Sequence, residues 1–323
     1  MNNLKEVVLM VVVLLFVSCN TTSNKTQKLT GVNPISYTDV AYISEKDTVI
    51  VSTYSGRIAK RIKGDKKEEV LAQINDEIYS LAYSEKTNEI IASTLASGIL
   101  ILDAKSRNIK RRLATGESWI NNIQLSNDRK YLMGYNGKGE NFVWDIYTNY
   151  ERMIYPESFT GGLIRFGKSN KLYHSYYDKM VIWNLENHTI TTQKINQGRL
   201  VDVDDANNKL LIHRNKFTIQ SATGDTTKTM SKKHPDWPYY QSGKDTIYRI
   251  PIQMELTVGC FAKNTICTGG FDRSIRFWNK TTGDLEGELL THRATISSIK
   301  VSKDQNQMVS VDLKGGIHFT DIN

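Results

Sequence analysis

The residue types that most often carry catalysis or bind metals are scattered along this 323-residue chain. No two of its histidines stand at the spacing with which one element holds a metal ion. The chain also lacks a glycine-rich phosphate loop before a helix and the motif of a serine nucleophile. We therefore expect a protein that is not an enzyme and that uses no cofactor and no metal ion. The six histidines are His174, His188, His213, His234, His292 and His318.

Three aspartates in the segment LVDVDDANNKLL raise calcium binding as an alternative, namely Asp202, Asp204 and Asp205. The segment lacks the glycine and the terminal glutamate of an EF-hand loop. It also falls where a strand and the following turn are expected. We therefore interpret these aspartates as residues of a strand edge and its turn.

Two cysteines flank the segment CFAKNTIC and are candidates for a disulfide. If Lys263 and Asn264 form a two-residue turn, Cys260 faces Cys267 across a hairpin. The Cβ atoms of facing residues lie within roughly 4.5–5.5 Å, which is near disulfide reach. Such a bond would persist outside the cytoplasm, and a pair of buried free thiols is the alternative.

The composition is that of a soluble globular protein, with 39% hydrophobic and 24% charged residues and a net charge of +8. Its basic residues gather in two groups that we interpret as solvated outer edges, with a patch for anionic lipid headgroups as the alternative. Nucleic acid is not an expected partner, because no aromatic side chains interleave with the basic ones. The groups are Arg57, Lys60, Arg61, Lys63, Lys66 and Lys67, and Lys105, Arg107, Lys110, Arg111 and Arg112.

Three segments share one spacing of apolar residues that ends in a serine: EIYSLAYS, ESWINNIQLS and RATISSIKVS. In each, a second apolar residue follows the first by three positions, and a third comes two positions later. A second apolar stretch and a turn come next, and then a third stretch such as residues 142–145. This order predicts a repeated unit of short antiparallel strands.

One position in the third stretch recurs seven times and gives the period of the repeat. Five of the six gaps between these positions lie between 36 and 42 residues, and the sixth is 59. We place an insertion in the long gap, at about residues 226–254. The seven positions are Arg61, Leu102, Trp144, Trp183, Ile219, Trp278 and Thr320.

These repeats make the chain similar to the WD40-repeat family over residues 29–323. Trp144-Asp145 is the family's dipeptide, and Trp183-Asn184 and Trp278-Asn279 are close to it. The resemblance implies an all-β fold, a seven-bladed β-propeller of four-stranded antiparallel blades. Each blade buries both faces against its neighbours, so near-continuous apolar runs such as residues 99–102 are expected.

Two expectations concern how this ring is held together. The last repeat ends after its third strand, so we expect residues 26–32 to supply the fourth and to close the ring by pairing the N- and C-terminal strands. The family's buried His–Ser–Asp–Trp set is complete in no repeat, since the sixth offers Thr268, Asp272 and Trp278 but no matching histidine. We therefore expect the blades to depend on apolar packing rather than on that network.

The N-terminus has the pattern of a secretory signal. Its apolar run from Val7 to Val17 is too short to span a bilayer core of about 30 Å as a helix. The ending LFVSC resembles a bacterial lipobox, which implies cleavage before Cys19 and lipidation of that residue. Residues 1–18 would be the signal peptide, and residues 19–28 the lipidated cysteine with a polar tether. A short anchor that is never cleaved is the alternative.

The resemblance to a lipoprotein implies a location in the bacterial cell envelope. The protein would be lipid-anchored to a membrane and would face the periplasm or the exterior. We expect a monomeric propeller there.

Aromatic residues recur beside the turn between the second and third strands, which lies on one rim of the ring in the WD40 family. Rim aromatics often anchor protein partners, and the alternative is that they pack between blades. We expect a scaffold that binds an unidentified protein through this rim. A small ligand or glycan in the central funnel is the alternative, ahead of an enzyme. The candidate rim residues are Trp119, Tyr54, Tyr135, Tyr176, Phe271 and His292.

Overall fold

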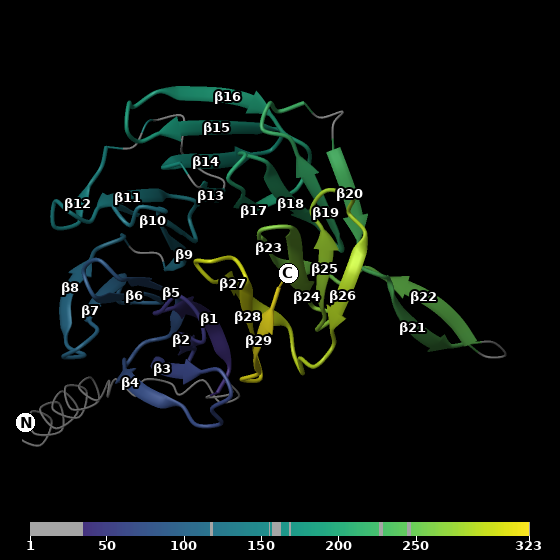
Figure 1. Ribbon diagram of the computed structural model, residues 1–323, viewed down its shortest axis with the longest axis horizontal. Coiled ribbons are helices and arrows are strands. Elements are labelled where there is room, and N and C mark those ends of the chain that lie inside the picture. Colours follow the sequence, from purple (N-terminus) through teal and green to yellow (C-terminus); the bar gives the residue numbers. More distant parts are fainter. Residues whose placement is uncertain are drawn as a thin grey trace, which may run out of the picture. The chain divides into compact units, whose positions relative to one another are not determined.

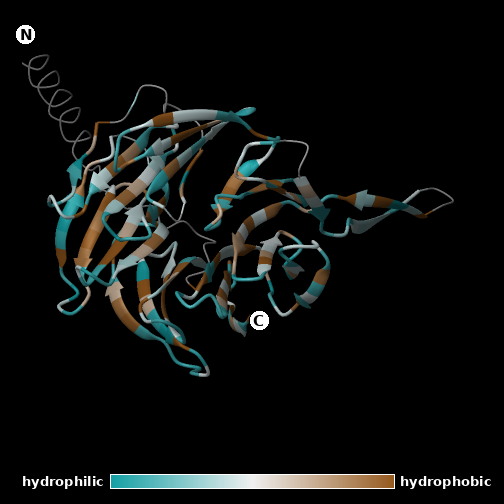
Figure 2. Ribbon diagram, turned by 45° about the horizontal axis from the view of Figure 1, so that its top comes forward, coloured by the Kyte–Doolittle hydropathy of each residue, from teal (hydrophilic) through white to brown (hydrophobic). Residues whose placement is uncertain are grey.

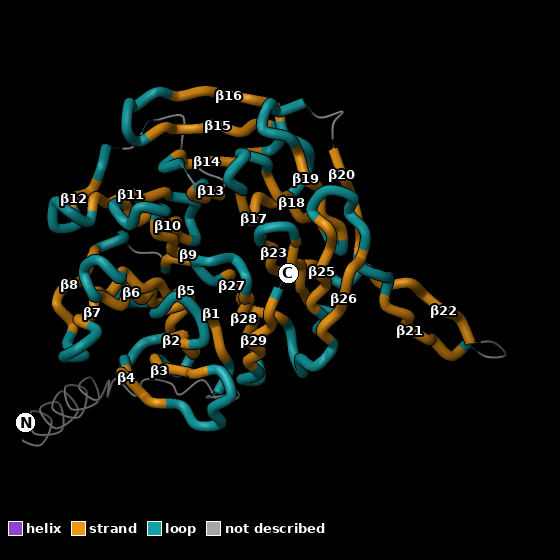
Figure 3. Tube along the Cα trace, viewed as in Figure 1, coloured by secondary structure: helices purple, strands orange, loops and turns teal. Residues whose placement is uncertain are grey.

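The computed structural model describes residues 35–116, 119–154, 156, 163–167, 169–225, 229–243 and 247–322. Within these ranges every regular element is a β-strand, so the prediction of an all-β chain is confirmed. Consecutive strands pair antiparallel and form a series of small separate sheets. Figure 3 shows these strands in orange, joined by short teal loops.

Six of the sheets are four-stranded blades, and their strands follow the chain order. Blades 1 to 3 are β1 (Tyr37–Tyr42), β2 (Thr48–Thr53), β3 (Arg57–Ile62) and β4 (Glu69–Gln73); β5 (Ile78–Ser84), β6 (Glu89–Thr94), β7 (Ile99–Asp103) and β8 (Ile109–Leu113); and β9 (Ile120–Leu125), β10 (Tyr131–Asn136), β11 (Asn141–Asp145) and β12 (Glu151–Arg152). Blades 4 to 6 are β13 (Leu163–Phe166), β14 (Lys171–Tyr176), β15 (Lys179–Asn184) and β16 (Ile190–Lys194); β17 (Arg199–Val203), β18 (Lys209–His213), β19 (Lys216–Gln220) and β20 (Thr229–Lys233); and β23 (Leu256–Phe261), β24 (Thr265–Gly270), β25 (Ile275–Asn279) and β26 (Leu285–Leu289).

The seventh blade has three described strands, β27 (Ile296–Val301), β28 (Gln307–Asp312) and β29 (Ile317–Asp321). The first strand of each blade contacts the first strand of the next, and β27 returns to contact β1. Figure 1 shows these first strands around the centre, with the later strands of each blade lying outward. The fold is a seven-bladed β-propeller, as predicted. The expected closing strand, residues 26–32, lies outside the described residues.

The seven positions that gave the repeat are in phase in the structure. Each pairs with the second residue of the second strand of its blade: Arg61 with Val49, and Trp278 with Ile266, for example. The same pairing holds for Leu102, Trp144, Trp183, Ile219 and Thr320. The period read from the sequence is therefore the structural period.

The hydrophobic core is divided into seven clusters, and each lies between two neighbouring blades. The cluster between blades 7 and 1 joins Val309 and Val311 to Val40, Val49 and Val51, all fully buried. Figure 2 shows the hydrophobic stretches, in brown, along the strands of adjoining blades. Both faces of each blade are thus removed from water, which explains the near-continuous apolar runs.

Polar side chains also join the first strands of neighbouring blades. The carboxylate of Asp39 in blade 1 accepts hydrogen bonds from the Ser80 hydroxyl and the Leu81 amide of blade 2, and from the Ser298 hydroxyl of blade 7. Asp202 in blade 5 accepts a hydrogen bond of 2.7 Å from the Phe261 amide of blade 6. The expectation that the ring depends on apolar packing was therefore too narrow.

The insertion is shorter than the sequence indicated. We placed it at about residues 226–254, but β20 pairs with β19, so blade 5 continues to Lys233. The added element is a separate hairpin of β21 (Trp237–Ser242) and β22 (Ile247–Ile252). Figure 1 shows the hairpin projecting from the blades between β20 and β23.

The predicted signal peptide, Cys19 and the polar tether lie outside the described residues. The part of the chain that the structure describes contains no helix with the length and hydrophobicity of a membrane span.

Candidate binding surface on one rim

One backbone hydrogen bond recurs on the rim where the second strand ends. The amide of a residue in the turn after that strand donates to the carbonyl just before the first strand of the same blade. Phe271 donates to Glu255 at 2.9 Å, and Gly137 donates to Trp119 at 3.0 Å. This bond places Trp119 and Phe271 on the same rim, as the sequence analysis expected.

The six predicted rim residues differ in their exposure. Trp119, Tyr176 and Phe271 expose 41%, 49% and 47% of their surface, so they are available to a partner. Tyr54 is half-buried and packs edge-on against Tyr79, with ring centroids 5.5 Å apart.

Tyr135 and His292 are buried, and including them in an exposed rim was wrong. The His292 ring nitrogens lie 3.0 Å from the Asp312 carboxylate and 2.7 Å from the Ser310 hydroxyl. These bonds make His292 a structural residue of blade 7. Tyr135 lies within β10, two positions before the turn, where its ring faces the Arg165 guanidinium at 5.8 Å.

Blade 6 contains the complete polar network that the sequence analysis judged absent. The Trp278 ring N–H donates to the Thr268 hydroxyl at 2.9 Å, and that hydroxyl lies 2.8 Å from Nε2 of His234. Nδ1 of His234 lies 2.8 Å from the Asp272 carboxylate and 2.6 Å from Nη1 of Arg276. Arg276 also binds Asp272, at 2.6 Å.

The missing histidine was hidden by the hairpin. His234 precedes Thr268 by 34 residues, whereas His292 precedes Ser310 by 18 in blade 7. We had assigned His234 to the insertion, although its backbone amide donates to Asn215 of blade 5 at 2.8 Å. Burial lowers the pKa of His234, and hydrogen bonds hold the pKa of Asp272 far below its usual range despite burial. Both ring nitrogens of His234 and the Asp272 carboxylate have partners inside the fold, which is typical of a network that stabilises the structure.

The turns between the second and third strands are tightest in blades 4 and 5, and we call this part of the rim the notch. In the other five blades, five residues separate the last paired residues of the second and third strands. In blades 4 and 5 the separation is only two residues, because Tyr176 pairs with Lys179 and His213 pairs with Lys216. Tyr177 and Arg214 take left-handed φ values of 51° and 52° in these tight turns.

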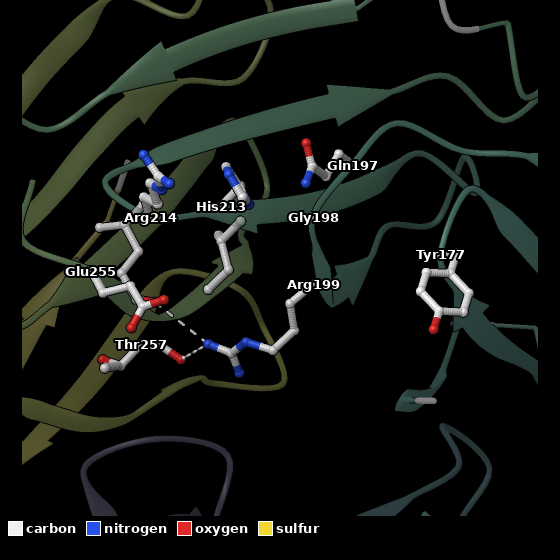
Figure 4. Close-up of a pocket in the computed structure, with 10 residues that line it drawn as sticks. Tyr177, Gln197, Gly198, Arg199, His213, Arg214, Glu255 and Thr257 are labelled. Atoms are coloured by element: carbon white, nitrogen blue, oxygen red, sulfur yellow. Dashed lines mark hydrogen bonds between the residues drawn. The ribbon is translucent and has the colours of Figure 1, made fainter. Parts of the chain in front are cut away.

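A cavity of about 650 Å³ opens at this notch, and a second of about 310 Å³ adjoins it. Both are lined by Tyr177 and Arg199, and Tyr176 lines the smaller one. We call the two cavities together the rim pocket. Figure 4 shows Arg199 extending from blade 5 toward the chain that carries Glu255 and Thr257, with Tyr177 on the neighbouring blade. Side chains that line the larger cavity include those of Tyr177, Gln197, Arg199, His213, Arg214 and Glu255.

Arg199 is the charged side chain held most firmly in the rim pocket. One terminal nitrogen, Nη2, donates to the Thr257 carbonyl at 2.6 Å and to the Leu256 carbonyl at 3.5 Å. Burial lowers the pKa of Arg199, and the nearby charge of Arg165 lowers it further. A guanidinium remains charged under all ordinary conditions, so the pocket contains a partly desolvated cation.

Arg199 reaches this place because blade 5 departs from the common register. In blades 1, 2, 3, 6 and 7 the first strand has a bulge near its start. In blade 5 the bulge falls at Val201, between Leu200 and Asp202. Leu200 is fully buried, and Arg199 beside it lines the cavity.

Tyr177 was not among the predicted rim residues. In blade 6, Phe271 comes five residues after Ile266, the residue that pairs with Trp278. In blade 4, the same count from Leu172, which pairs with Trp183, reaches Tyr177. Tyr176, which we chose, is one residue earlier. Tyr177 exposes 81% of its surface, and its ring lies edge-on to that of Tyr176 at 4.4 Å.

The hairpin of β21 and β22 presents one apolar face. Its cross-strand pairs place Trp237 with Ile252, Tyr239 with Ile250 and Gln241 with Tyr248 on the same side. Every large apolar member of this hairpin face is at least 38% exposed. Arg273 lies over the Trp237 ring at 5.5 Å, which links the base of the hairpin to blade 6.

The other predicted sites have structural explanations. Cys260 and Cys267 face each other, as expected, but both thiols are free, and their mutual hydrogen bond raises the pKa of Cys260. Asp204 accepts hydrogen bonds from Asn208 across its turn and pairs with Lys280, which agrees with the interpretation as a turn residue. Within the described ranges no cluster of acids, histidines or cysteines could hold a metal ion.

Several members of the two basic groups pair with acidic neighbours. Glu68 pairs with Arg57, Glu69 pairs with Lys60 and Arg107, and Glu89 pairs with Lys110. This pairing favours the interpretation as a solvated outer edge over a patch for anionic lipid.

No protein-family model and no curated protein sequence matches the chain.

Proposed function

We propose that this propeller is a non-enzymatic scaffold that binds a partner protein at the notched rim of blades 4 to 6. The observation that carries the proposal is the rim pocket, where short turns leave Tyr176, Tyr177 and Arg199 at an open cavity. Aromatic and arginine side chains are the residue types that most often dominate the binding energy of protein interfaces. The hairpin face lies next along the chain before Glu255, which also lines the pocket.

We further propose that the chain is a divergent relative of WD40-repeat proteins and is attached to a bacterial membrane through lipidated Cys19. The buried His234–Thr268–Asp272–Trp278 network supports the relation to that family, because it has the order of the family's network with the threonine hydroxyl in place of that of serine. The LFVSC ending of the apolar run supports the anchor. The scaffold would then hold its partner at a membrane surface.

A matched pair of tyrosine variants tests the scaffold function. Tyr177 lies at the notched rim, and Tyr147 lies in the turn between β11 and β12, on the opposite rim, with 49% exposure. We expect a stoichiometric partner to copurify with the full chain from solubilised membranes. Tyr177→Ser should reduce its recovery at least tenfold, and Tyr147→Ser should leave it unchanged.

Two results would contradict this proposal. One is equal recovery of the partner with both variants, which would place the contact elsewhere. The other is the absence of any stoichiometric partner together with saturable binding of a small molecule, which would favour the small-ligand or glycan alternative.

A further inference from the structure

The hydrogen-bonding capacity of Arg199 is only partly used within the chain. Both of its hydrogen bonds leave from Nη2, toward the carbonyls of Leu256 and Thr257. Among the described residues, no partner accepts from its Nε or its Nη1. Figure 4 shows both dashed bonds starting from one nitrogen of the guanidinium. The arginine is therefore held in place while two of its donor groups remain available.

The charges around the rim pocket favour an anion. Arg165 lies close enough to Arg199 to lower its pKa, and its own guanidinium is fixed by the Asn122 side chain at 3.1 Å. Arg214 lines the cavity and is exposed. Glu255 is the acidic side chain among the lining residues, and it is exposed. Among the lining residues, the two arginines Arg199 and Arg214 and the one carboxylate of Glu255 leave a local excess of positive charge.

The wall next to Arg199 is aromatic. Tyr176 and Tyr177 line the smaller cavity together with Arg199 and Leu163. Tyr177 occupies a left-handed turn position, and its ring is 81% exposed. An aromatic or aliphatic group could rest on these rings while a charged group reaches the arginine.

We propose that the rim pocket binds a carboxylate group carried on an apolar chain, with Arg199 holding the carboxylate and the Tyr176–Tyr177 pair holding the apolar part. The planar guanidinium fork matches the two oxygens of a carboxylate, and its fixation by Leu256 and Thr257 removes much of the cost of ordering it.

This inference rests on the proposed function and specifies it: the partner presents an acidic side chain or a C-terminal carboxylate beside an apolar residue. A singly charged group suits the site better than a phosphate, because Glu255 opposes a second negative charge.

Matched probes that differ in one charge test the proposal on the full chain. N-acetyl-phenylalanine carries a terminal carboxylate, and its amide does not. N-acetyl-aspartyl-phenylalanine amide carries a side-chain carboxylate, and the asparaginyl analogue does not. Calorimetric titration should show each acid binding at least tenfold more tightly than its neutral analogue. The acid that binds more tightly identifies whether the partner supplies a chain terminus or a side chain.

Two arginine variants locate the binding. Arg199→Gln should remove the tenfold preference for the acids. Arg112→Gln should preserve it, because Arg112 is also bonded to two backbone carbonyls, those of Ala96 and Ser97, but lies in blade 2. If Arg199→Gln fails to fold, Tyr177→Ser provides the second test, since its exposed ring can be removed without disturbing the core. That variant should weaken both acids at least threefold.

The proposal is overturned if no acid binds, if acids and neutral analogues bind equally, or if Arg199→Gln keeps the preference. Any of these results can coexist with loss of the partner in Tyr177→Ser. The scaffold function would then stand, and only the carboxylate chemistry would fail.

Discussion

Blades 4 and 5 and blades 6 and 7 use the same turn in opposite ways. In blades 6 and 7, five residues separate the paired strands, and Asp272 and Asp312 in these turns bind buried histidines. In blades 4 and 5 the turn has two residues, no acid reaches back into the blade, and a cavity opens. In blades 6 and 7 the acids of the turn thus stabilise the blade, whereas the tight turns of blades 4 and 5 border an open cavity.

The hydrogen-bonding groups of blade 6 and of the rim pocket show the same contrast. His234 uses both ring nitrogens within blade 6, whereas Arg199 keeps two donor groups for which the described residues offer no partner. A buried polar group whose bonds are all made is expected to contribute to stability. A fixed cation with unused donors is better suited to binding.

The largest expected effect is on stability, at His234. His234→Ala removes the link between Thr268 and Asp272 and leaves a cavity, so we expect a loss of about 3 kcal/mol in the free energy of unfolding. His213→Ala, at an exposed histidine of blade 5, should change it by less than about 0.5 kcal/mol. Urea denaturation of both variants measures the difference. Equal losses of unfolding free energy in the two variants would contradict a stabilising role of the His234 network.

The second prediction concerns acid. Burial lowers the pKa of His234 in the folded state, so below the usual histidine pKa of about 6.5 the unfolded chain binds a proton that the folded chain does not. Stability should therefore fall as the pH decreases from 7 to 5. Asp272 stays ionised in this range, because its pKa is held far lower. In the same urea denaturation series, the stability of His234→Gln should depend less on pH than that of the unmodified protein. Parallel dependences on pH would exclude His234 as the cause of the acid sensitivity.

A buried lysine of blade 5 gives the third prediction. Lys209 is fully buried, its amine donates to the carbonyls of Ser221 and Ala222, and burial lowers its pKa to about 8. Between this value and the ordinary lysine pKa, only the unfolded chain keeps the proton, so stability rises with pH. The unmodified protein should gain stability relative to Lys209→Met between pH 7.5 and about 10. An unchanged difference across this range would mean that Lys209 titrates normally.

Much of the fold could be read from the sequence, because the repeat is a pattern of apolar residues and turns. All seven recurring positions, from Arg61 to Thr320, fall at one place in their blades. The two shortest gaps in that series end at Trp183 and Ile219, in the blades with two-residue turns. Those gaps were a signal of the notch, although we did not use them.

The binding surface was harder to predict, because it depends on local departures from the repeat. A displaced bulge brings Arg199 to the cavity, and a single-residue offset separates Tyr177 from Tyr176. The hairpin separated His234 from its blade in the sequence, although the two meet in the fold. Burial of Tyr135 and His292 could not be read from residue type, since the same types are exposed elsewhere on the chain.

Photo-cross-linking tests the central claim most directly, namely that the notched rim of blades 4 to 6 contacts a partner. Tyr177 or Tyr147 is replaced by p-benzoylphenylalanine in the full chain, and the cells are irradiated before lysis. Both positions are exposed, but they lie on opposite rims. The account predicts one discrete protein adduct from position 177 and none from position 147. An adduct from position 147 alone, or no adduct from either position, would contradict it.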